Sequence, residues 1–151
     1  MIIGFIIIGL IVLVDQFTKW LTVTYVGDQT IVIIKNFFNL VEHHNDGAGW
    51  SIFAGQWLFL ILVTLVSLGF FIYLFKSISF KTKWVYSLAV SFMIGGTLGN
   101  FIDRIRLRYV IDFLQFTFGS YTFPTFNVAD SALTVGVILF AIDIFFLEPK
   151  R

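Results

Sequence analysis

Four long apolar runs, separated by polar segments, constrain this chain more than any other feature of its sequence. The second run, Trp57–Phe75, and the third, 84–102, each hold 19 consecutive uncharged residues. The first carries no charge before Asp15, and the last contains two acids, Asp130 and Asp143. A helix needs about 20 apolar residues to cross the hydrocarbon core of a bilayer. We therefore expect four spanning helices, at about residues 2–20, 57–75, 84–102 and 127–147.

The composition supports a membrane protein with a single domain, residues 1–151. Hydrophobic residues make up 58% of the chain and charged residues 13%, and the mean hydropathy is +0.93. Soluble domains are about 45–50% apolar and about 25% charged. The net charge of +1 offers no electrostatic basis for binding nucleic acid. The absence of cysteine excludes disulfides, thiol nucleophiles and thiolate metal sites. The N-terminus lacks the basic region and cleavage site of a targeting peptide, so we expect the first span to be retained.

Two polar segments connect the spans on one side of the bilayer. In the first, β-branched and aromatic residues at 30–34 and 36–40 indicate short strands. Unpaired strands would leave backbone groups unsatisfied in lipid, so this segment is expected at the interface or outside. The second segment, 103–126, is expected to form a polar loop that is half-apolar around Asp112 and lies along the membrane surface.

Basic residues give a weak indication of orientation. Five lie on one side of the predicted spans, in the short loop and the tail, and five lie on the other, so the positive-inside rule does not decide. The compact basic loop and the tail favour cytoplasmic termini. The first side holds Lys76, Lys81, Lys83, Lys150 and Arg151, and the second holds Lys19, Lys35, Arg104, Arg106 and Arg108.

Four carboxylates converge at one face of the bilayer, whatever the orientation. With four spans, Asp15, Asp103, Asp112 and Asp130 all fall where the two polar segments meet. Asp143 follows Asp130 by 13 residues, about 20 Å along a helix, and belongs near the other face. Acids in or near spans are costly and indicate function by default.

Two of these acids, Asp112 and Asp130, suit acid–base chemistry. Two neighbouring carboxylates do not readily both ionise, so one keeps a proton while the other stays charged. The charged group can take a proton from water and the protonated group can polarise a carbonyl, with no metal or cofactor. Simpler roles stay open: Asp130 as a first-turn acid in a helix capped by Asn127, and Asp112 as an ion-pair partner of Arg104, Arg106 or Arg108.

Other polar residues favour structural roles. Asp15 and Lys19 have the i, i+4 spacing of a helical ion pair, and the neighbours Asp103 and Arg104 are expected to neutralise each other. The histidines His43 and His44 lack further metal-ligand spacing and are expected to be solvated. Ser51 and Ser131 have no nearby base, which disfavours a serine nucleophile. The glycines at 95–99 indicate close helix packing, and three tryptophans near span ends indicate interfacial anchors: Trp20, Trp57 and Trp84.

Five motifs in order resemble the lipoprotein signal peptidase family, also called signal peptidase II. They extend from residue 15 to residue 131, nearly the whole chain. Each is short, and their order and spacing carry the resemblance. The motifs are Asp15-Gln16-Phe17-Thr18-Lys19, Asn45-Asp46-Gly47-Ala48-Gly49-Trp50-Ser51, Gly95-Gly96-Thr97-Leu98-Gly99-Asn100-Phe101-Ile102-Asp103-Arg104, Val110-Ile111-Asp112-Phe113 and Phe126-Asn127-Val128-Ala129-Asp130-Ser131.

The resemblance implies an activity and a set of site residues. It implies that Asp112 and Asp130 are the catalytic pair, and that Arg104 helps to hold substrate or inhibitors such as globomycin. It implies an aspartic endopeptidase that removes the signal peptide from diacylglyceryl-modified prolipoproteins, just before the lipidated cysteine. The residues that it implies for substrate binding or support of the site are Asn45, Gly47, Asn100, Asp103, Arg104, Asn127 and Ala129, with Asp15 and Lys19 as structural polar residues.

The resemblance also implies a fold and a location. The fold is an all-α membrane bundle of four helices with a small extracytoplasmic β-cradle and a surface helix or loop. The location is the bacterial cytoplasmic membrane, with cytoplasmic termini and the active site at the outer face. Membrane lipids and lipid-modified prolipoproteins are the implied partners of a monomeric enzyme.

Two other classes of protein remain as alternatives on the sequence alone. Intramembrane acids would suit a proton- or ion-coupled transporter, although they gather at one face rather than forming a path. A structural membrane scaffold would explain the spans but not the uncompensated Asp112. Presenilin-like aspartyl proteases are disfavoured, because their Y-D and G-x-G-D motifs are absent.

Overall fold

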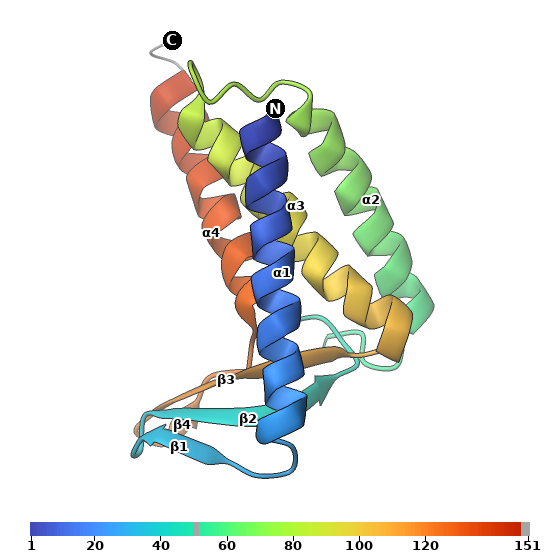
Figure 1. The fold of residues 1–151 in the computed structure, drawn as a ribbon, viewed down its shortest axis with the longest axis vertical. Coiled ribbons are helices and arrows are strands. Elements are labelled where there is room, and N and C mark those ends of the chain that lie inside the picture. The colour runs from blue at the N-terminus through green and yellow to red at the C-terminus, as the bar shows by residue number, and fades with distance from the viewer. Residues whose placement is uncertain (50–51, 149–151) are drawn as a thin grey trace.

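The computed structural model describes residues 1–49 and 52–148, and shows a helical bundle with a small sheet at one end (Figure 1). Within the described residues, four helices are long and apolar enough to cross a membrane. The motif residues Trp50 and Ser51 and the basic tail residues Lys150 and Arg151 lie outside this part of the chain. The helices are α1 (Ile2–Tyr25), α2 (Trp57–Phe75), α3 (Trp84–Leu107) and α4 (Val128–Ile142), which a π-helical turn, Asp143–Leu147, continues.

Helix α2 has the predicted bounds, whereas α1 and α3 each extend five residues beyond their predicted ends. The third predicted span ended just before its first charge, Asp103, and the first was extended past Asp15 and Lys19 only to about Trp20. Helical hydrogen bonding does not stop at a charge when the side chain finds a partner. In the extended part of α1, Thr22 and Thr24 donate their hydroxyls to carbonyls of the preceding turn.

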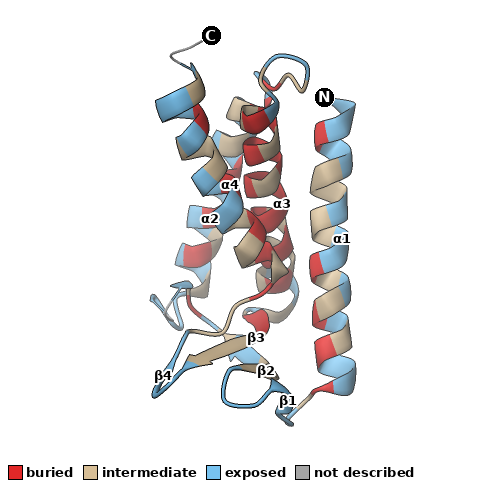
Figure 2. Ribbon diagram, turned by 90° about the vertical axis from the view of Figure 1, so that its left-hand side faces the viewer, coloured by how far each residue is buried: buried red, intermediate tan, exposed pale blue. Residues whose placement is uncertain are grey.

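Helix α3 lies at the centre of the bundle and carries more buried residues than any other described element, as the red segments in Figure 2 show. Close approach explains the predicted glycine run. A methyl group added to Gly95 would lie 2.9 Å from Ile11 of α1, and one added to Gly99 would lie 2.7 Å from an Asp15 carboxylate oxygen. The small residues therefore let α1 and α4 pack directly against the backbone of α3.

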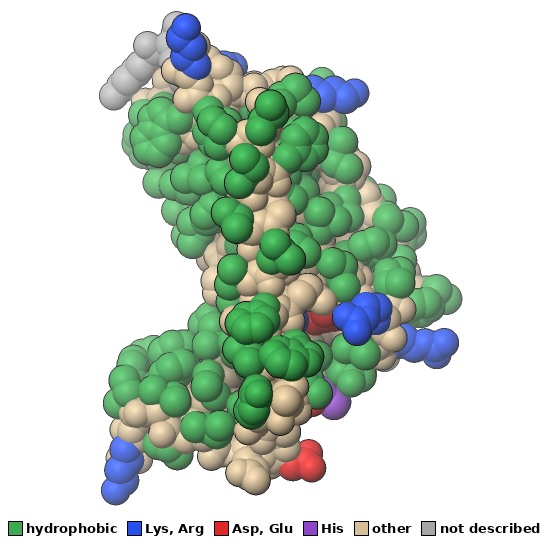
Figure 3. All heavy atoms as spheres, in the orientation of Figure 1, with side chains coloured by type: hydrophobic (Ala, Val, Ile, Leu, Met, Phe, Trp, Pro, Cys, Tyr) green, Lys and Arg blue, Asp and Glu red, His purple; other side chains and the backbone are tan. Residues whose placement is uncertain are grey.

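The apolar core lies near the end of the bundle that holds the N-terminus. Phe75 and Ile78 meet Val90, Met93 and Ile94 there. Most other large apolar side chains on α1, α2 and α4 are exposed, as expected for residues that face lipid. In Figure 3 the helical shaft is covered by hydrophobic side chains, and charged side chains stand at its ends and on the sheet.

The sheet is antiparallel with the order β1-β2-β3-β4. Its strands are β1 (Ile31–Ile34), β2 (Phe38–Asn45), β3 (Val110–Phe118) and β4 (Tyr121–Thr122). The two predicted strands in the first polar segment are confirmed. The second segment was predicted as a surface loop, and this is wrong for β3, which pairs with β2 so that His43 lies opposite Asp112. Pairing satisfies the backbone of both segments.

The surface element between β2 and α2 is mainly a loop in its described residues, with Gly49 in a 3-10 conformation. It turns at Phe53 and Gly55, whose φ angles are 62° and 75°. Ile52 and Phe53 are exposed, and Phe53 packs against Phe59 with ring centroids 4.9 Å apart. This loop borders the junction between the sheet and the helices.

Candidate active site

The first turn of α4 places Asp130 at the junction of sheet and bundle. Asn127 caps this helix: its side-chain oxygen accepts from the backbone N–H of Asp130 at 2.9 Å, and Asp130 Oδ2 accepts from the backbone N–H of Asn127 at 3.2 Å. The predicted capping role is therefore present. It engages only one carboxylate oxygen, because Oδ1 accepts from the Asn100 amide at 2.7 Å.

Strand β3 places Asp112 beside this helix start. Its side chain is buried, with 1% exposure, and both of its oxygens accept hydrogen bonds from amides. Asn127 Nδ2 donates to Oδ1 at 2.7 Å, and Asn45 Nδ2, from β2, donates to Oδ2 at 2.9 Å. Among the described residues no arginine forms an ion pair with Asp112. Arg104 instead donates to the carbonyl of Gly47 at 3.1 Å, while the side chains of Arg106 and Arg108 are exposed.

Asp112 and Asp130, together the aspartate pair, are thus held by asparagines from three elements. Asn45 comes from β2, Asn100 from α3, and Asn127 directly precedes α4. Two links join the two carboxylates. Asn127 donates its side-chain NH2 to Asp112 and its backbone N–H to Asp130, and its NH2 group also donates at 3.0 Å to Asn100 Oδ1, whose own amide reaches Asp130. Neutral amides can orient carboxylates without neutralising them, which keeps both available for proton transfer.

The environment of Asp112 favours its protonated form. Burial, and then the negative charge of Asp130, raise the pKa of Asp112 from its ordinary 3.8 to about 7, against the opposing hydrogen bonds from Asn45 and Asn127. A carboxyl group that keeps its proton near neutral pH can donate it to a reacting carbonyl.

A lysine cluster, Lys19 with Asp15 and Asp103, contacts Asn100 on the side away from the aspartate pair. The Lys19 ammonium lies 2.8 Å from a carboxylate oxygen of each aspartate and donates to Asn100 Oδ1 at 2.9 Å. The predicted ion pair of Asp15 and Lys19 is present. The predicted mutual neutralisation of Asp103 and Arg104 is wrong, because Asp103 turns toward α1 and pairs with Lys19.

The lysine cluster also joins helices and strand. Asp15 accepts from the backbone N–H of Ala129 at 2.8 Å, which ties α1 to the start of α4. Asp103 accepts from the backbone N–H of Ile111 at 3.2 Å, which ties α3 to β3. Ala129 is fully buried, so its part in the site is to bring its backbone close to Asp15.

Two residues of this region had no predicted role in the site. Gln16 Nε2 donates to Asp103 at 2.9 Å and to Asp15 and the Gly99 carbonyl at 3.2 Å each. The indole N–H of Trp57, predicted only as an interfacial anchor, donates to the Arg104 carbonyl at 2.7 Å. A polar residue next to Asp15 on an apolar helix is the one sequence signal that could have identified Gln16.

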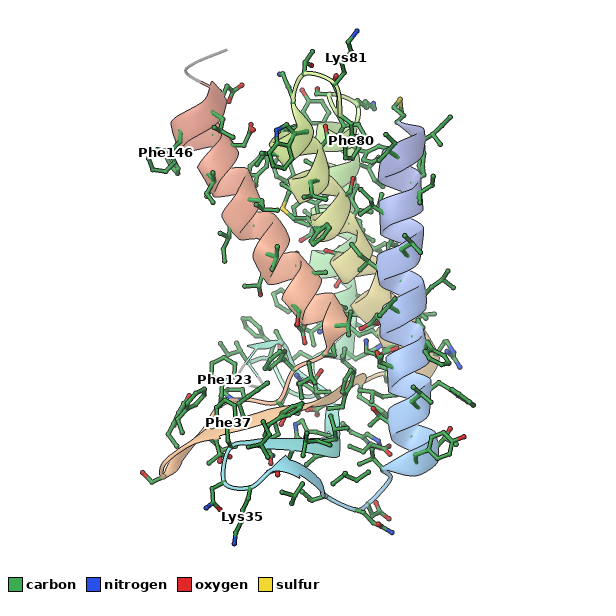
Figure 4. The ribbon with its side chains drawn as sticks, turned by 60° about the vertical axis from the view of Figure 1, so that its left-hand side comes forward. Lys35, Phe37, Phe80, Lys81, Phe123 and Phe146 are labelled. Carbon is green, nitrogen blue, oxygen red and sulfur yellow. The ribbon has the colours of Figure 1, made fainter. Side chains whose placement is uncertain are left out.

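A cavity of about 930 Å³ opens beside the aspartate pair. Its polar end is formed by Asp112, Asp130, Asn45, Asn100 and Arg104. Its other walls are mainly apolar and come from the segment after β4 and the outer side of α4. Figure 4 shows Phe123, one of these wall residues, at the sheet end of the molecule near Phe37, far from Lys81 and Phe146 at the opposite end. The apolar wall includes Phe123, Pro124, Phe126, Leu133 and Val135.

Comparisons with known proteins agree with this architecture. The profile of the family described as signal peptidase (SPase) II matches residues 7–146. A lipoprotein signal peptidase of Listeria monocytogenes serotype 4a is 41% identical over 141 residues, covering 93% of this chain and 91% of that protein. One from Geobacillus thermodenitrificans is 40% identical over 152 residues, covering 99% of this chain and 94% of that protein.

Solved structures share the fold as well. A bacterial membrane enzyme structure determined by the in meso method superposes with a TM-score of 0.83 at 33% identity, covering 98% of this chain and 93% of that chain. A second such structure gives the same TM-score at 34% identity and covers 95% of this chain. With the family profile matching nearly the whole chain, this multi-pass bacterial membrane protein belongs to the signal peptidase II family of peptidases.

Proposed function

We propose that this protein removes signal peptides from diacylglyceryl-modified prolipoproteins, with Asp112 and Asp130 as the catalytic residues and cleavage just before the lipidated cysteine. The observation that carries the proposal is the aspartate pair itself: two carboxylates, each held by amides on both oxygens, at the polar end of one cavity. The names of the relatives supply the substrate class.

The proposed reaction needs only these two groups and water. One carboxylate takes a proton from water as the oxygen attacks the scissile carbonyl, and the protonated carboxyl gives its proton to the carbonyl oxygen. The tetrahedral intermediate then collapses. The proton taken from water passes to the leaving amine, and the intermediate returns a hydroxyl proton to the second carboxylate, which restores the starting state. The amides of Asn45, Asn100 and Asn127 hold the carboxylates in place throughout.

The cavity suits a substrate that is part peptide and part lipid. Its polar end could accept the peptide backbone, and Arg104 lies there, held by its hydrogen bond to Gly47 in the loop after β2. Its apolar wall continues onto the outer side of α4, where Val135 is 43% exposed and would face lipid. Acyl chains on the cysteine would stay close to the bilayer along this wall while the scissile bond meets the aspartate pair. All these groups come from one chain, which supports a monomeric enzyme.

We further propose that both termini lie in the cytoplasm and that the sheet and the aspartate pair lie at the outer face. The sheet and both termini stand at opposite ends of the bundle, so the location of one fixes the other. Reporter fusions at residue 1 and within the β1–β2 turn would test this. We expect the reporter at residue 1 to be in the cytoplasm and the reporter in the β1–β2 turn to be outside the cell membrane. The reverse result would refute the proposed orientation.

A gel-shift assay tests the proposed reaction. Three purified proteins in detergent are compared: wild type, Asp112→Asn and Asp130→Asn. Each is mixed separately with a diacylglyceryl-modified prolipoprotein and with the unlipidated form of the same prolipoprotein. Cleavage of the lipidated form alone, lost in both folded variants, is expected. Full activity in either variant would exclude the aspartate pair, and no cleavage by folded wild-type protein would exclude the substrate class.

The transporter and scaffold alternatives lose their support. The family is one of peptidases, and four of the five acids considered meet at one end of the bundle.

A further inference from the structure

Lys19 is a buried charge that the proposed reaction does not use. Its side chain is 2% exposed, on a helix that spans the membrane. Burying a lysine in a span is costly, and its position normally has a function. Its two carboxylate partners, Asp15 and Asp103, balance the charge but leave one donor of the ammonium unaccounted for.

The third hydrogen bond of Lys19 fixes the orientation of Asn100. An ammonium group only donates, so the atom of Asn100 at 2.9 Å from Nζ must be the side-chain oxygen. The NH2 group of Asn100 must then face the other way, toward Asp130 Oδ1 at 2.7 Å. Asparagine orientations are otherwise ambiguous, and here a neighbouring charge decides.

Asn127 is oriented by the same oxygen. Asn100 Oδ1 accepts from Asn127 Nδ2 at 3.0 Å, so the NH2 group of Asn127 faces Asn100 and its oxygen faces the backbone N–H of Asp130. This NH2 group has two hydrogens but three acceptors: Asn100 Oδ1, the Ile111 carbonyl at 3.3 Å and Asp112 Oδ1 at 2.7 Å. Asp112 therefore receives a shared donor, whereas Asp130 receives a donor polarised by the ammonium.

The two carboxylates differ in other ways that point in the same direction. Asp130 is partly exposed and accepts from a backbone N–H at the start of α4, where the helix dipole favours negative charge. Asp112 is buried, with 1% exposure, and forms no ion pair among the described residues. Burial without an ion-pair partner favours the neutral form of a carboxyl group.

We propose that Lys19 is a positioning residue which, through Asn100, directs the negative charge of the aspartate pair to Asp130 and leaves the proton on Asp112. This inference rests on the proposed function. It makes Asp130 the group that takes a proton from water and Asp112 the group that donates one to the scissile carbonyl. The pKa of Asp112, raised to about 7, agrees with this assignment.

Few other charged or titratable groups lie close enough to the aspartate pair to decide which of the two carboxyl groups keeps the proton. Arg104 interacts electrostatically with Asp130, Asp112 and Asp103, but its side chain donates its hydrogen bond to the Gly47 carbonyl. His43 lines the same cavity and is exposed. The groups that face the pair are Asp15 and Lys19 from α1, Asp103 and Arg104 from α3, and His43 from β2.

The pH dependence of kcat/KM tests this role. The double variant Lys19→Gln with Asp103→Asn removes the ammonium and one of its two partner carboxylates, so the local net charge is unchanged. Asp15 loses its ion-pair partner but keeps the hydrogen bonds that it accepts from Gln16 and from the Ala129 N–H. Without the ammonium the negative charge forms less readily, so the acidic limb of the profile should move to higher pH by about one unit. Below that limb kcat/KM should fall about tenfold relative to wild type.

Three single variants serve as controls for the double variant. Lys19→Arg keeps the charge and should keep the acidic limb near its wild-type pH. Asp103→Asn removes a negative charge but keeps the ammonium, so the limb should stay or move to lower pH. Lys35→Gln removes an exposed lysine at the tip of the sheet, far from the bundle in Figure 4, and should leave the limb in place.

A reduced plateau with an unmoved acidic limb in the double variant would overturn the proposal, because that is the result of a merely structural role. Infrared spectra of protein labelled with 13C-aspartate give a second readout. The band of a protonated carboxyl group near neutral pH should disappear in Asp112→Asn, and its survival there would place the proton elsewhere. If Asp112→Asn or Asp130→Asn retained full cleavage activity, the proposed function itself would have failed, which is a different result from an unmoved limb.

Discussion

Helices α2 and α3 each contain a run of 19 consecutive uncharged residues, yet α2 is mostly exposed and α3 is mostly buried. In the most apolar window of α3, 61% of the residues are buried, against 22% for α2. The buried residues of α3 include polar ones such as Ser91, Asn100 and Asp103, whereas α2 exposes Leu58, Leu62 and Val66. In a bilayer the apolar helix can face the lipid, and the helix with polar and small residues must lie inside.

This contrast explains why the site is built around α3. Asn100, Asp103 and Arg104 lie within its last two turns, and α1, α4 and β3 each place a polar group against them. No buried side-chain nitrogen or oxygen among the described residues lacks a hydrogen-bond partner. The polar interior is therefore satisfied as a unit, and α2 contributes to it only at its edge, through Trp57.

The largest effect that would sharpen the contrast is expected at the helix glycines. A side chain at Gly96 of α3 would collide with backbone atoms of α4, including the Leu133 nitrogen at 2.8 Å. Gly69 of α2 has nothing within 4 Å. We expect Gly96→Leu to prevent folding, a loss above about 4–5 kcal/mol, and Gly69→Leu to be neutral or stabilising by about 1 kcal/mol. Yield and thermal unfolding in detergent measure both, and a folded Gly96→Leu protein would contradict the central placement of α3.

A smaller but still large effect is expected for the buried charge on α3. Asp103→Ala leaves Lys19 with one carboxylate and removes the acceptor of the Ile111 N–H, so the free energy of unfolding should fall by about 3–5 kcal/mol. Ser67→Ala on α2 removes an exposed hydroxyl that bonds only to its own helix and should change stability by less than about 0.5 kcal/mol. Equal losses in both variants would break the contrast.

The sequence predicted much of this division, and the reason for each miss is a contact between distant segments. Apolar runs predicted the four spans because lipid contact depends on composition alone. Strand β3 was missed because its partner β2 lies about 70 residues earlier and only pairing makes the half-apolar pattern a strand. The partner of Asp103 was wrong because the ion pair with Lys19 depends on how α1 packs against α3, which local spacing does not reveal.

The pH dependence of stability tests whether the polar interior holds a neutral acid. The pKa of Asp112 is raised to about 7 in the folded protein from its ordinary 3.8, so the unfolded chain loses this proton first as pH rises. The contribution of the Asp112 carboxyl group to the free energy of unfolding is complete below about pH 4. It is lost as the pH rises from 4 to 7, at about 1.4 kcal/mol per pKa unit. Between pH 4.5 and 8 we expect wild type to lose about 2–4 kcal/mol relative to Asp112→Asn, measured by thermal unfolding. A parallel pH dependence of the two proteins would mean that Asp112 is charged throughout.

The smallest effect is expected where α2 touches the polar interior. Trp57→Phe removes the indole N–H that donates to the Arg104 carbonyl, but this carbonyl still accepts from the Arg108 N–H at 3.2 Å, and a phenyl ring remains for the Arg108 guanidinium, now 5.3 Å from the indole ring. We expect a loss of about 0.5–1.5 kcal/mol in the free energy of unfolding. Trp20→Phe, at a 54% exposed position that stacks on Phe17, is the matched control and should be nearly neutral. A loss above about 3 kcal/mol for Trp57→Phe would mean that a polar link, rather than apolar packing, holds α2 against α3, and the two helices would then differ less than their burial indicates.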